Sequence, residues 1–216
     1  MTDEGNLDAG RFSTWLASIN GVLRGEQGSD VPCGDCTACC TSSQFVHIEP
    51  DEKSTMAHIP KELLFPAPRL PEGHVLMGYD EQGHCPMLVD GQCSIYEHRP
   101  RTCRAYDCRV FAATGTTIPD SAKERIANQV RRWEFRFPSA EDEAEYRSVR
   151  NAATYLADHG AELEEGFGTM TPLQRSLLSI QLYEMFPSRG LDAGQSGETE
   201  PPLSAVRVEL RKKAKR

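Results

Sequence analysis

The placement of cysteine is the strongest constraint on what this chain can fold into. All eight cysteines of the 216-residue sequence lie between Cys33 and Cys108, and the rest of the chain contains none. The first residues, MTDEGNLDAG, are acidic where a secretory or mitochondrial signal would be basic, and no apolar run approaches the ~20 residues that cross a bilayer. We therefore expect a cytoplasmic protein without a membrane span. Disulfides are disfavoured in the reducing cytosol, so the grouped cysteines indicate metal ligands or catalytic thiols.

The first cysteine group reads Cys33-Gly-Asp-Cys36-Thr-Ala-Cys39-Cys40. Two intervening residues let a tight turn present successive sulfurs to one centre, and this step recurs in zinc sites and iron–sulfur sites alike. A ferredoxin-type cluster adds a remote Cys-Pro, which is present here as Cys85-Pro86. The spacing C-x3-C-x2-C of radical-SAM enzymes is absent, which disfavours that class.

The second group contains no further C-x2-C, so a paired-knuckle zinc ribbon is not the obvious interpretation. Asp90-Gly91 lies between two strand-like runs and predicts a hairpin with a type I′ turn. In that register Leu88 faces Cys93, which puts Cys85 and Cys93 on opposite faces of the hairpin. Two alternatives stay open: Pro86 bends Cys85 out of the strand, or the eight thiols are divided between two sites. The group consists of Cys85, Cys93, Cys103 and Cys108.

Charged and imidazole side chains surround these cysteines. Guanidinium groups would lower thiol pKa values and offset the negative charge of a metal bound by four thiolates. An anionic substrate or a solvated basic loop would explain them equally well. Histidines near the cysteines are candidate ligands or proton donors, and two aspartates are candidate hydrogen-bond acceptors. The residues concerned are Arg99, Arg101, Arg104, Arg109, His47, His84, His98, Asp35 and Asp107.

The flanking sequence has the apolar spacing of helices. Residues 7–23 show the stripe of one amphipathic helix, and about three helices are expected after Thr117. The first of these carries its stripe through Phe137, and the next two begin at capping boxes, Ser139 with Asp142 and Thr171 with Gln174. Short strands are expected over 44–48, 74–79, 84–89 and 92–96, and a brief helix between 49 and 64.

The predicted fold class is therefore α+β. A small cysteine-rich metal-binding domain with short antiparallel strands is expected to be flanked by an N-terminal helix and a C-terminal set of about three helices. The expected divisions are 1–30 for the N-terminal helix and linker, 31–115 for the cysteine domain, 116–186 for the helical segment and 187–216 for a disordered tail with a basic end. The formal net charge of −8 makes nucleic acid an improbable partner.

The cysteine motifs resemble those of the CxxCxxCC, or YkgJ-like, family of zinc- or iron-chelating domains. The resemblance covers CGDCTACC at 33–40, the strand-like segment at 44–48 and CPMLVDGQCSIYEHRPRTCRAYDC at 85–108. It implies metal or iron–sulfur binding, with Cys108 as an extra cysteine that only some relatives have. The family also includes flagellin lysine N-methylases, but nothing after Thr117 allows a methyl-donor site to be carried over. The ligands that the resemblance implies are Cys33, Cys36, Cys39, Cys40, Cys85, Cys93 and Cys103.

The sequence therefore predicts a cytoplasmic metal-binding protein that chelates zinc or iron, or an iron–sulfur cluster, with all eight cysteines as candidate ligands. One alternative is an iron–sulfur enzyme for redox chemistry or group transfer, such as a lysine N-methylase relative, because the thiols outnumber one four-ligand site. Another is a metal-stabilised interaction module whose acidic helical half and basic tail bind a protein partner. No phosphate loop, nucleophile elbow or H-E-x-x-H helix is present, so no catalytic residue is identified.

Overall fold

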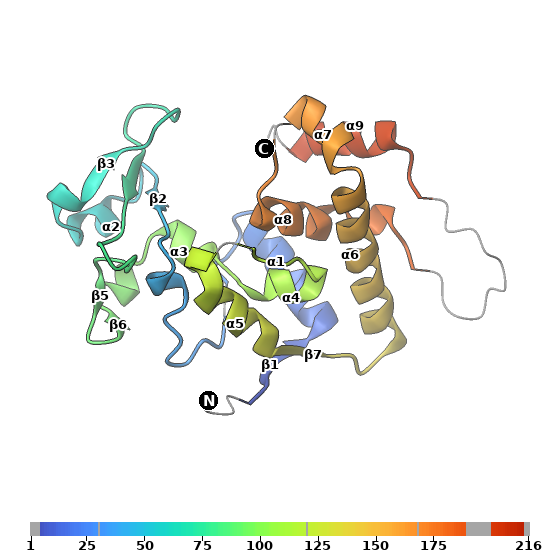
Figure 1. Cartoon of the computed structure of the whole chain (residues 1–216), viewed down its shortest axis with the longest axis horizontal. Helices are drawn as coiled ribbons and strands as arrows, with labels where there is room; N and C mark the ends of the chain where they lie inside the picture. Colours follow the sequence, from blue (N-terminus) through green and yellow to red (C-terminus); the bar gives the residue numbers. More distant parts are fainter. Residues whose placement is uncertain (1–4, 30, 120, 168, 189–199, 214–216) are drawn as a thin grey trace. The chain divides into compact units, whose positions relative to one another are not determined.

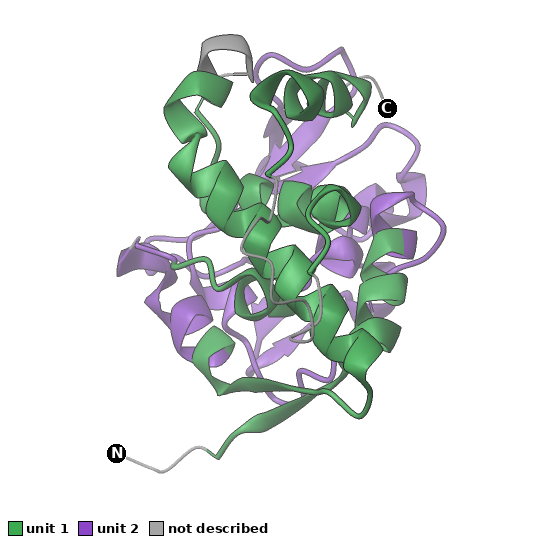
Figure 2. Ribbon diagram, turned by 90° about the vertical axis from the view of Figure 1, so that its right-hand side faces the viewer, with its two compact units in different colours: residues 1–20, 108–117, 130–216 green, residues 21–107, 118–129 purple. Residues whose placement is uncertain are grey.

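The computed structural model describes residues 5–213 except 30, 120, 168 and 189–199. The chain forms two compact units, coloured green and purple in Figure 2. Unit 1 consists of Met1–Asn20, Cys108–Thr117 and Val130–Arg216, and unit 2 of Gly21–Asp107 and Ile118–Gln129. Each unit is thus assembled from separated stretches of the chain. The expected domain boundaries stay predictions.

Unit 1 begins with a strand where the sequence predicted a helix. Strand β1 (Leu7–Arg11) pairs in parallel with β7 (Trp133–Arg136), and helix α1 (Phe12–Leu23) starts only after it. The prediction was wrong for residues 7–11 because the backbone partner of this strand lies over a hundred residues away and leaves no local pattern. The predicted helix through Phe137 is likewise shorter, because α5 (Glu124–Arg132) ends where β7 begins.

The other helices of unit 1 are α4 (Arg109–Thr114), α6 (Ala140–Asp158), α7 (Gly160–Phe167), α8 (Pro172–Leu182) and α9 (Leu203–Lys213), with a 3-10 turn, η5 (Tyr183–Met185), after α8 (Figure 1). Both predicted capping boxes are confirmed. Ser139 and Asp142 exchange side-chain and backbone hydrogen bonds at the start of α6, and Thr171 and Gln174 do the same at α8. Helix α6 ends at Asp158 with His159 as its C-cap, and Gly160 begins α7.

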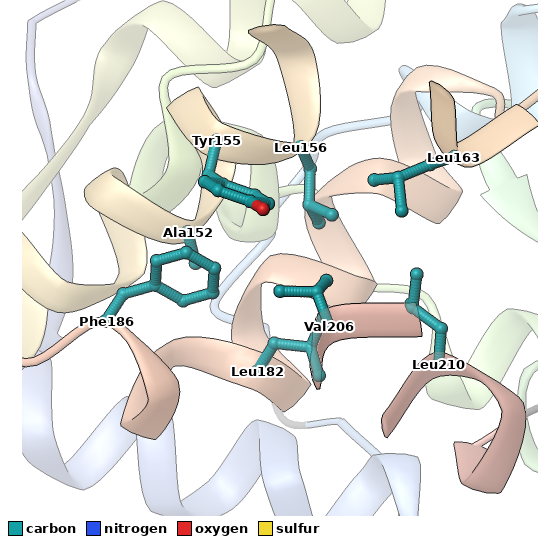
Figure 3. Packing of buried hydrophobic residues seen from close by; sticks show 8 residues of the cluster. All are labelled: Ala152, Tyr155, Leu156, Leu163, Leu182, Phe186, Val206 and Leu210. Carbon is teal, nitrogen blue, oxygen red and sulfur yellow. The ribbon is translucent and has the colours of Figure 1, made fainter. Parts of the chain in front are cut away.

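Helix α9 completes the apolar core of unit 1. Val206 and Leu210 are buried against Leu156 of α6 and Leu182 of α8, among other side chains (Figure 3). Residues 203–213 were expected within a disordered tail, but they form a helix. Their apolar residues recur at helical spacing, although basic residues lie between and after them. Residues 189–199 of the expected tail lie outside the described residues.

Unit 2 is built from short elements. An antiparallel sheet has the strand order β2 (Val46–Ile48), β4 (Val75–Met77), β3 (Leu64–Pro66), and β5 (Leu88–Val89) and β6 (Gln92–Cys93) form a hairpin. Its helices are α2 (Lys53–Ala57), α3 (Arg101–Ala105) and the first part of α5. The unit also contains the 3-10 turns η1 (Cys39–Thr41), η2 (Lys61–Leu63), η3 (Tyr96–His98) and η4 (Ser121–Lys123).

A second apolar cluster forms the core of unit 2. Val46, Ile48 and Met77 from the sheet are buried together with Ile59, Met87 and Ile95 from the connecting segments. Short strands and helices around one cluster in unit 2, together with the helices of unit 1, give the α+β class that the sequence predicted. None of the helices in the described ranges is long and apolar enough to cross a membrane.

Candidate metal centre

The first cysteine group folds as a tight turn followed by one 3-10 turn. Cys36 N–H donates to the Cys33 carbonyl over 3.0 Å, and Gly34 between them has a positive φ of 53°. Cys39 and Cys40 then begin η1, which the Ser42 hydroxyl closes by donating to the Ala38 carbonyl over 2.6 Å. The four cysteines of this group thus lie on one compact loop.

A backbone hydrogen bond joins the two cysteine groups. Cys85 N–H donates to the Cys40 carbonyl over 2.6 Å. The loop before Cys85 is shaped by Asp80, whose Oδ1 accepts from His84 N–H over 2.8 Å. Residues far apart in the sequence are therefore held side by side, and Cys40 lies next to Cys85.

Cys85 lies outside the hairpin that carries Cys93. The type I′ turn is confirmed, with φ of 50° at Asp90 and 77° at Gly91, and Leu88 pairs with Cys93 as predicted. The strand begins only at Leu88, however, so Cys85 is outside the ladder. The rule of alternating faces does not apply to it, and Cys85 and Cys93 need not point apart.

Three of the four cysteines of the second group share one environment. Cys85, Cys93 of β6 and Cys103 of α3 are half-buried, and all three pack against the apolar core of unit 2. Their elements come from different parts of the chain. The core of unit 2 therefore brings these three cysteines together.

Burial and neighbouring thiols raise the pKa of two cysteines. Burial raises the pKa of Cys40 to about 11, and negative charge at Cys85 and Cys93 adds to the shift. Burial raises the pKa of Cys103 to about 12, where Cys85 and Cys40 add to it and the Arg99 guanidinium opposes it. In the metal-free chain these groups are neutral thiols, and binding of a metal would release their protons.

The cysteine side chains lie near one another, but they are not arranged around a single metal position. Within the described ranges, no three Cys, His, Asp or Glu side chains converge as the ligands of one ion. Cys33 and Cys36 lie close enough to Cys40 to influence its pKa. The donor set, half-buried thiols around one apolar core, suits zinc or iron.

Cys108 has a different setting from the other seven cysteines. It belongs to unit 1, is 6% exposed, and its Sγ accepts a hydrogen bond from Trp133 Nε1 over 3.2 Å. Arg109, the next residue, is also buried in unit 1 and donates to the Ala9 carbonyl over 3.4 Å. The other seven cysteines belong to unit 2.

The candidate histidines and aspartates take part in separate contacts. His47 and His74 lie with Nε2 and Nδ1 2.9 Å apart, and Nδ1 of His98 lies 3.2 Å from the Ser54 hydroxyl. Asp107 is buried and accepts from the Ser29 hydroxyl over 3.0 Å, whereas Asp35 is exposed.

The arginines also differ among themselves. Arg99 stacks on the Tyr96 ring, with its guanidinium carbon 3.6 Å from the ring centre. Arg101 forms ion pairs with Glu49 and Asp51, and Arg104 is exposed. Sequence reasoning missed Glu52, a buried carboxylate beside α3. A single glutamate within the polar run EPDEKST gives no signal that it is buried.

The comparisons with known proteins agree with this placement. Residues 32–130 match the model of the CxxCxxCC family, described as a "Putative zinc- or iron-chelating domain". No curated protein and no solved structure shows a significant match to the chain. The matched range contains every cysteine of the sequence, and the description supports metal binding in general. Residues 32–130, less than half of the chain, are therefore similar to the CxxCxxCC family.

Proposed function

We propose that unit 2 binds zinc or iron through cysteine thiolates, with Cys40, Cys85, Cys93 and Cys103 as the central four ligands. The observation that carries this proposal is that four separate segments bring these thiols together. Cys85, Cys93 and Cys103 pack against one apolar core, and Cys40 is hydrogen-bonded through its carbonyl to Cys85 N–H. Charge at Cys93 contributes to the raised pKa of Cys40, Cys85 and Cys103. Packing alone does not explain such a gathering of like groups, whereas one metal would use all of them.

Cys33, Cys36 and Cys39 supply further thiols beside Cys40. A structural zinc site is complete with four ligands, so these three serve either a second ion or the larger ligand demand of an iron–sulfur cluster. Cys108, hydrogen-bonded to Trp133 in unit 1, has a structural role in this proposal. We propose a cytoplasmic location, because a reducing compartment keeps clustered cysteines available as metal ligands.

The test is metal analysis of the full chain, purified anaerobically without added metal. Zinc, iron and acid-labile sulfide per chain are measured together with the visible spectrum. We expect one or two zincs without sulfide, or about four irons with matching sulfide and visible absorption. Wild-type protein that holds neither zinc nor iron would overturn the proposal.

A matched pair of variants assigns the ligands. Cys103→Ser is expected to lose most of the bound metal, while Cys108→Ser, which also replaces one thiol by a hydroxyl, is expected to keep it. Equal metal content in the two variants would show that the central four are chosen wrongly.

A further inference from the structure

Glu52 is a carboxylate buried next to the candidate metal centre. Its side chain is 6% exposed, and each of its oxygens accepts a backbone hydrogen bond. Oε2 accepts from Glu49 N–H over 2.9 Å, and Oε1 accepts from Arg101 N–H over 2.5 Å. A buried carboxylate is costly unless such bonds compensate its lost hydration, so these two contacts fix where Glu52 lies.

The contact with Arg101 connects Glu52 to the helix that carries a proposed ligand. Arg101 is the first residue of α3, and Cys103 lies two residues further along. The next residue, Thr102, makes a second contact with the same part of the chain, because its hydroxyl donates to the His47 carbonyl over 2.7 Å. Two successive residues of α3 are thus hydrogen-bonded to residues 47–52.

A third contact is different in kind. The Arg101 guanidinium pairs with Asp51 over 2.9 Å and with Glu49, but all three side chains are exposed. Ion pairs of this type contribute little because water and salt screen them. The part-buried hydrogen bond to the buried Glu52 carboxylate is therefore the contact that we expect to determine the position of α3.

Helix α3 depends on such contacts. It has five residues, far fewer than a helix needs to be stable in water by itself. Its Cys103 packs against the core of unit 2, near Cys40, Cys85 and Cys93. A shift of α3 would therefore move one sulfur of the central four relative to the other three.

We propose that Glu52, assisted by Thr102, is a positioning residue of the metal centre: it holds α3 so that the Cys103 sulfur stays beside the other three thiols. This inference rests on the proposed function, since it takes Cys103 to be a ligand. Groups that orient the ligands of a metal commonly change its affinity by roughly 10- to 100-fold when they are removed.

The test uses the full chain loaded with Co²⁺, whose thiolate-to-cobalt absorption increases with the number of bound sulfurs. Cobalt affinity is measured by competition with a chelator, and the absorption is expressed per bound cobalt. Glu52→Ala is expected to bind cobalt roughly 10- to 100-fold more weakly, with lower absorption per cobalt. Glu52→Gln keeps one acceptor oxygen and is expected to lie between Glu52→Ala and wild type.

Three further variants separate positioning from a general loss of structure. Arg101→Ala removes only the exposed ion pairs and is expected to bind cobalt within about threefold of wild type. Glu62→Ala, at an exposed position of the same unit, is the matched control. Thr102→Val is expected to weaken cobalt binding, and Thr102→Ser is expected to bind cobalt as wild type does. If Glu52→Ala does not fold, this pair tests whether hydrogen bonds to residues 47–52 position α3.

The outcomes distinguish this inference from the function on which it rests. Wild-type affinity and absorption in Glu52→Ala, with a normal wild-type spectrum, would overturn the positioning role and leave metal binding by the cysteines standing. If Glu52→Ala is unfolded, wild-type behaviour of Thr102→Val would overturn it in the same way. Wild-type protein without thiolate-to-cobalt absorption would overturn both.

Discussion

At the scale of single residues, Asp142 connects two parts of unit 1. The carboxylate is fully buried and accepts from Arg11 Nε over 2.9 Å and from Ser13 N–H over 3.0 Å. It also accepts from the Ser139 hydroxyl over 2.6 Å within the capping box. Burial by itself would raise the pKa of Asp142, but these hydrogen bonds outweigh burial and hold the pKa well below its usual range.

The lowered pKa predicts how stability depends on pH. A carboxyl with a lower pKa in the folded chain stabilises the fold above about pH 4, where the unfolded chain loses the proton, and this contribution is lost as the pH falls further. Asp142→Asn should therefore lower the Tm by several degrees at pH 7, and its difference from wild type should shrink below about pH 4. Thermal unfolding followed by circular dichroism at a series of pH values measures both.

Asp8→Asn is the control for this prediction. Asp8 lies on β1, the strand that also carries Arg11, and pairs with Arg136 of β7. Both side chains of this pair are exposed. Its replacement should change the Tm little at any pH. A pH-independent difference between Asp142→Asn and wild type would show that the loss comes from packing and not from the charge of the carboxylate.

At the scale of elements, the sequence was informative where the signal is local. The capping boxes of α6 and α8 and the Asp90-Gly91 turn each depend on residues within three positions, and all are found as predicted. The parallel pairing of β1 with β7 and the hydrogen bond from Cys85 to Cys40 depend on residues far apart in the chain. A single sequence does not indicate such long-range contacts. That the two cysteine groups would lie together was therefore inferred from metal-binding chemistry and not from a pattern in the sequence.

The Asp90-Gly91 turn gives a prediction about the hairpin that carries Cys93. Gly91 has a φ of 77°, and no atom lies within 4 Å of where a Cβ would be placed, so only the backbone conformation opposes substitution. Gly91→Ala should destabilise the hairpin by about 1–2 kcal/mol and weaken metal binding by a similar free energy. Competition with a chelator measures the affinity.

Asp90→Asn provides the comparison for the turn, because asparagine tolerates positive φ and forms the same turn type with glycine. It should bind metal as wild type does. If Gly91→Ala also binds metal as tightly as wild type, the geometry of the hairpin does not determine where the Cys93 sulfur lies.

Helix α9 allows a similar comparison on unit 1. Leu210 is 3% exposed and packs in the core, whereas Val208 of the same helix is 52% exposed. Leu210→Ala should cost about 2–4 kcal/mol of unfolding free energy through lost burial and the cavity left behind. Val208→Ala should change it by less than about 0.5 kcal/mol. Denaturant unfolding of both variants tests whether α9 is part of the core; equal effects would contradict it.

At the scale of the whole molecule, the chain has two units with separate apolar clusters. The cluster of unit 1 is contributed by α6 to α9 and neighbouring turns, and that of unit 2 by the short strands and the segments between them. The seven cysteines belong to the unit that has little regular structure. Such a unit gains few backbone hydrogen bonds and little buried area from its elements, so a bound metal would supply much of its folding free energy.

This division predicts that removal of metal affects the two units unequally. After treatment with a strong chelator, amides of β2, β4 and the β5–β6 hairpin should exchange hydrogen much faster, because unit 2 loses the metal that stabilises it. Amides of α6 and α8 should keep their protection, since the core of unit 1 contains none of the proposed ligands. Hydrogen exchange followed by mass spectrometry resolves the segments.

Cys103→Ser without chelator should reproduce the pattern of the chelated wild type. Unchanged exchange in unit 2 after proven loss of the metal would mean that the ion is bound as cargo by a domain that folds without it.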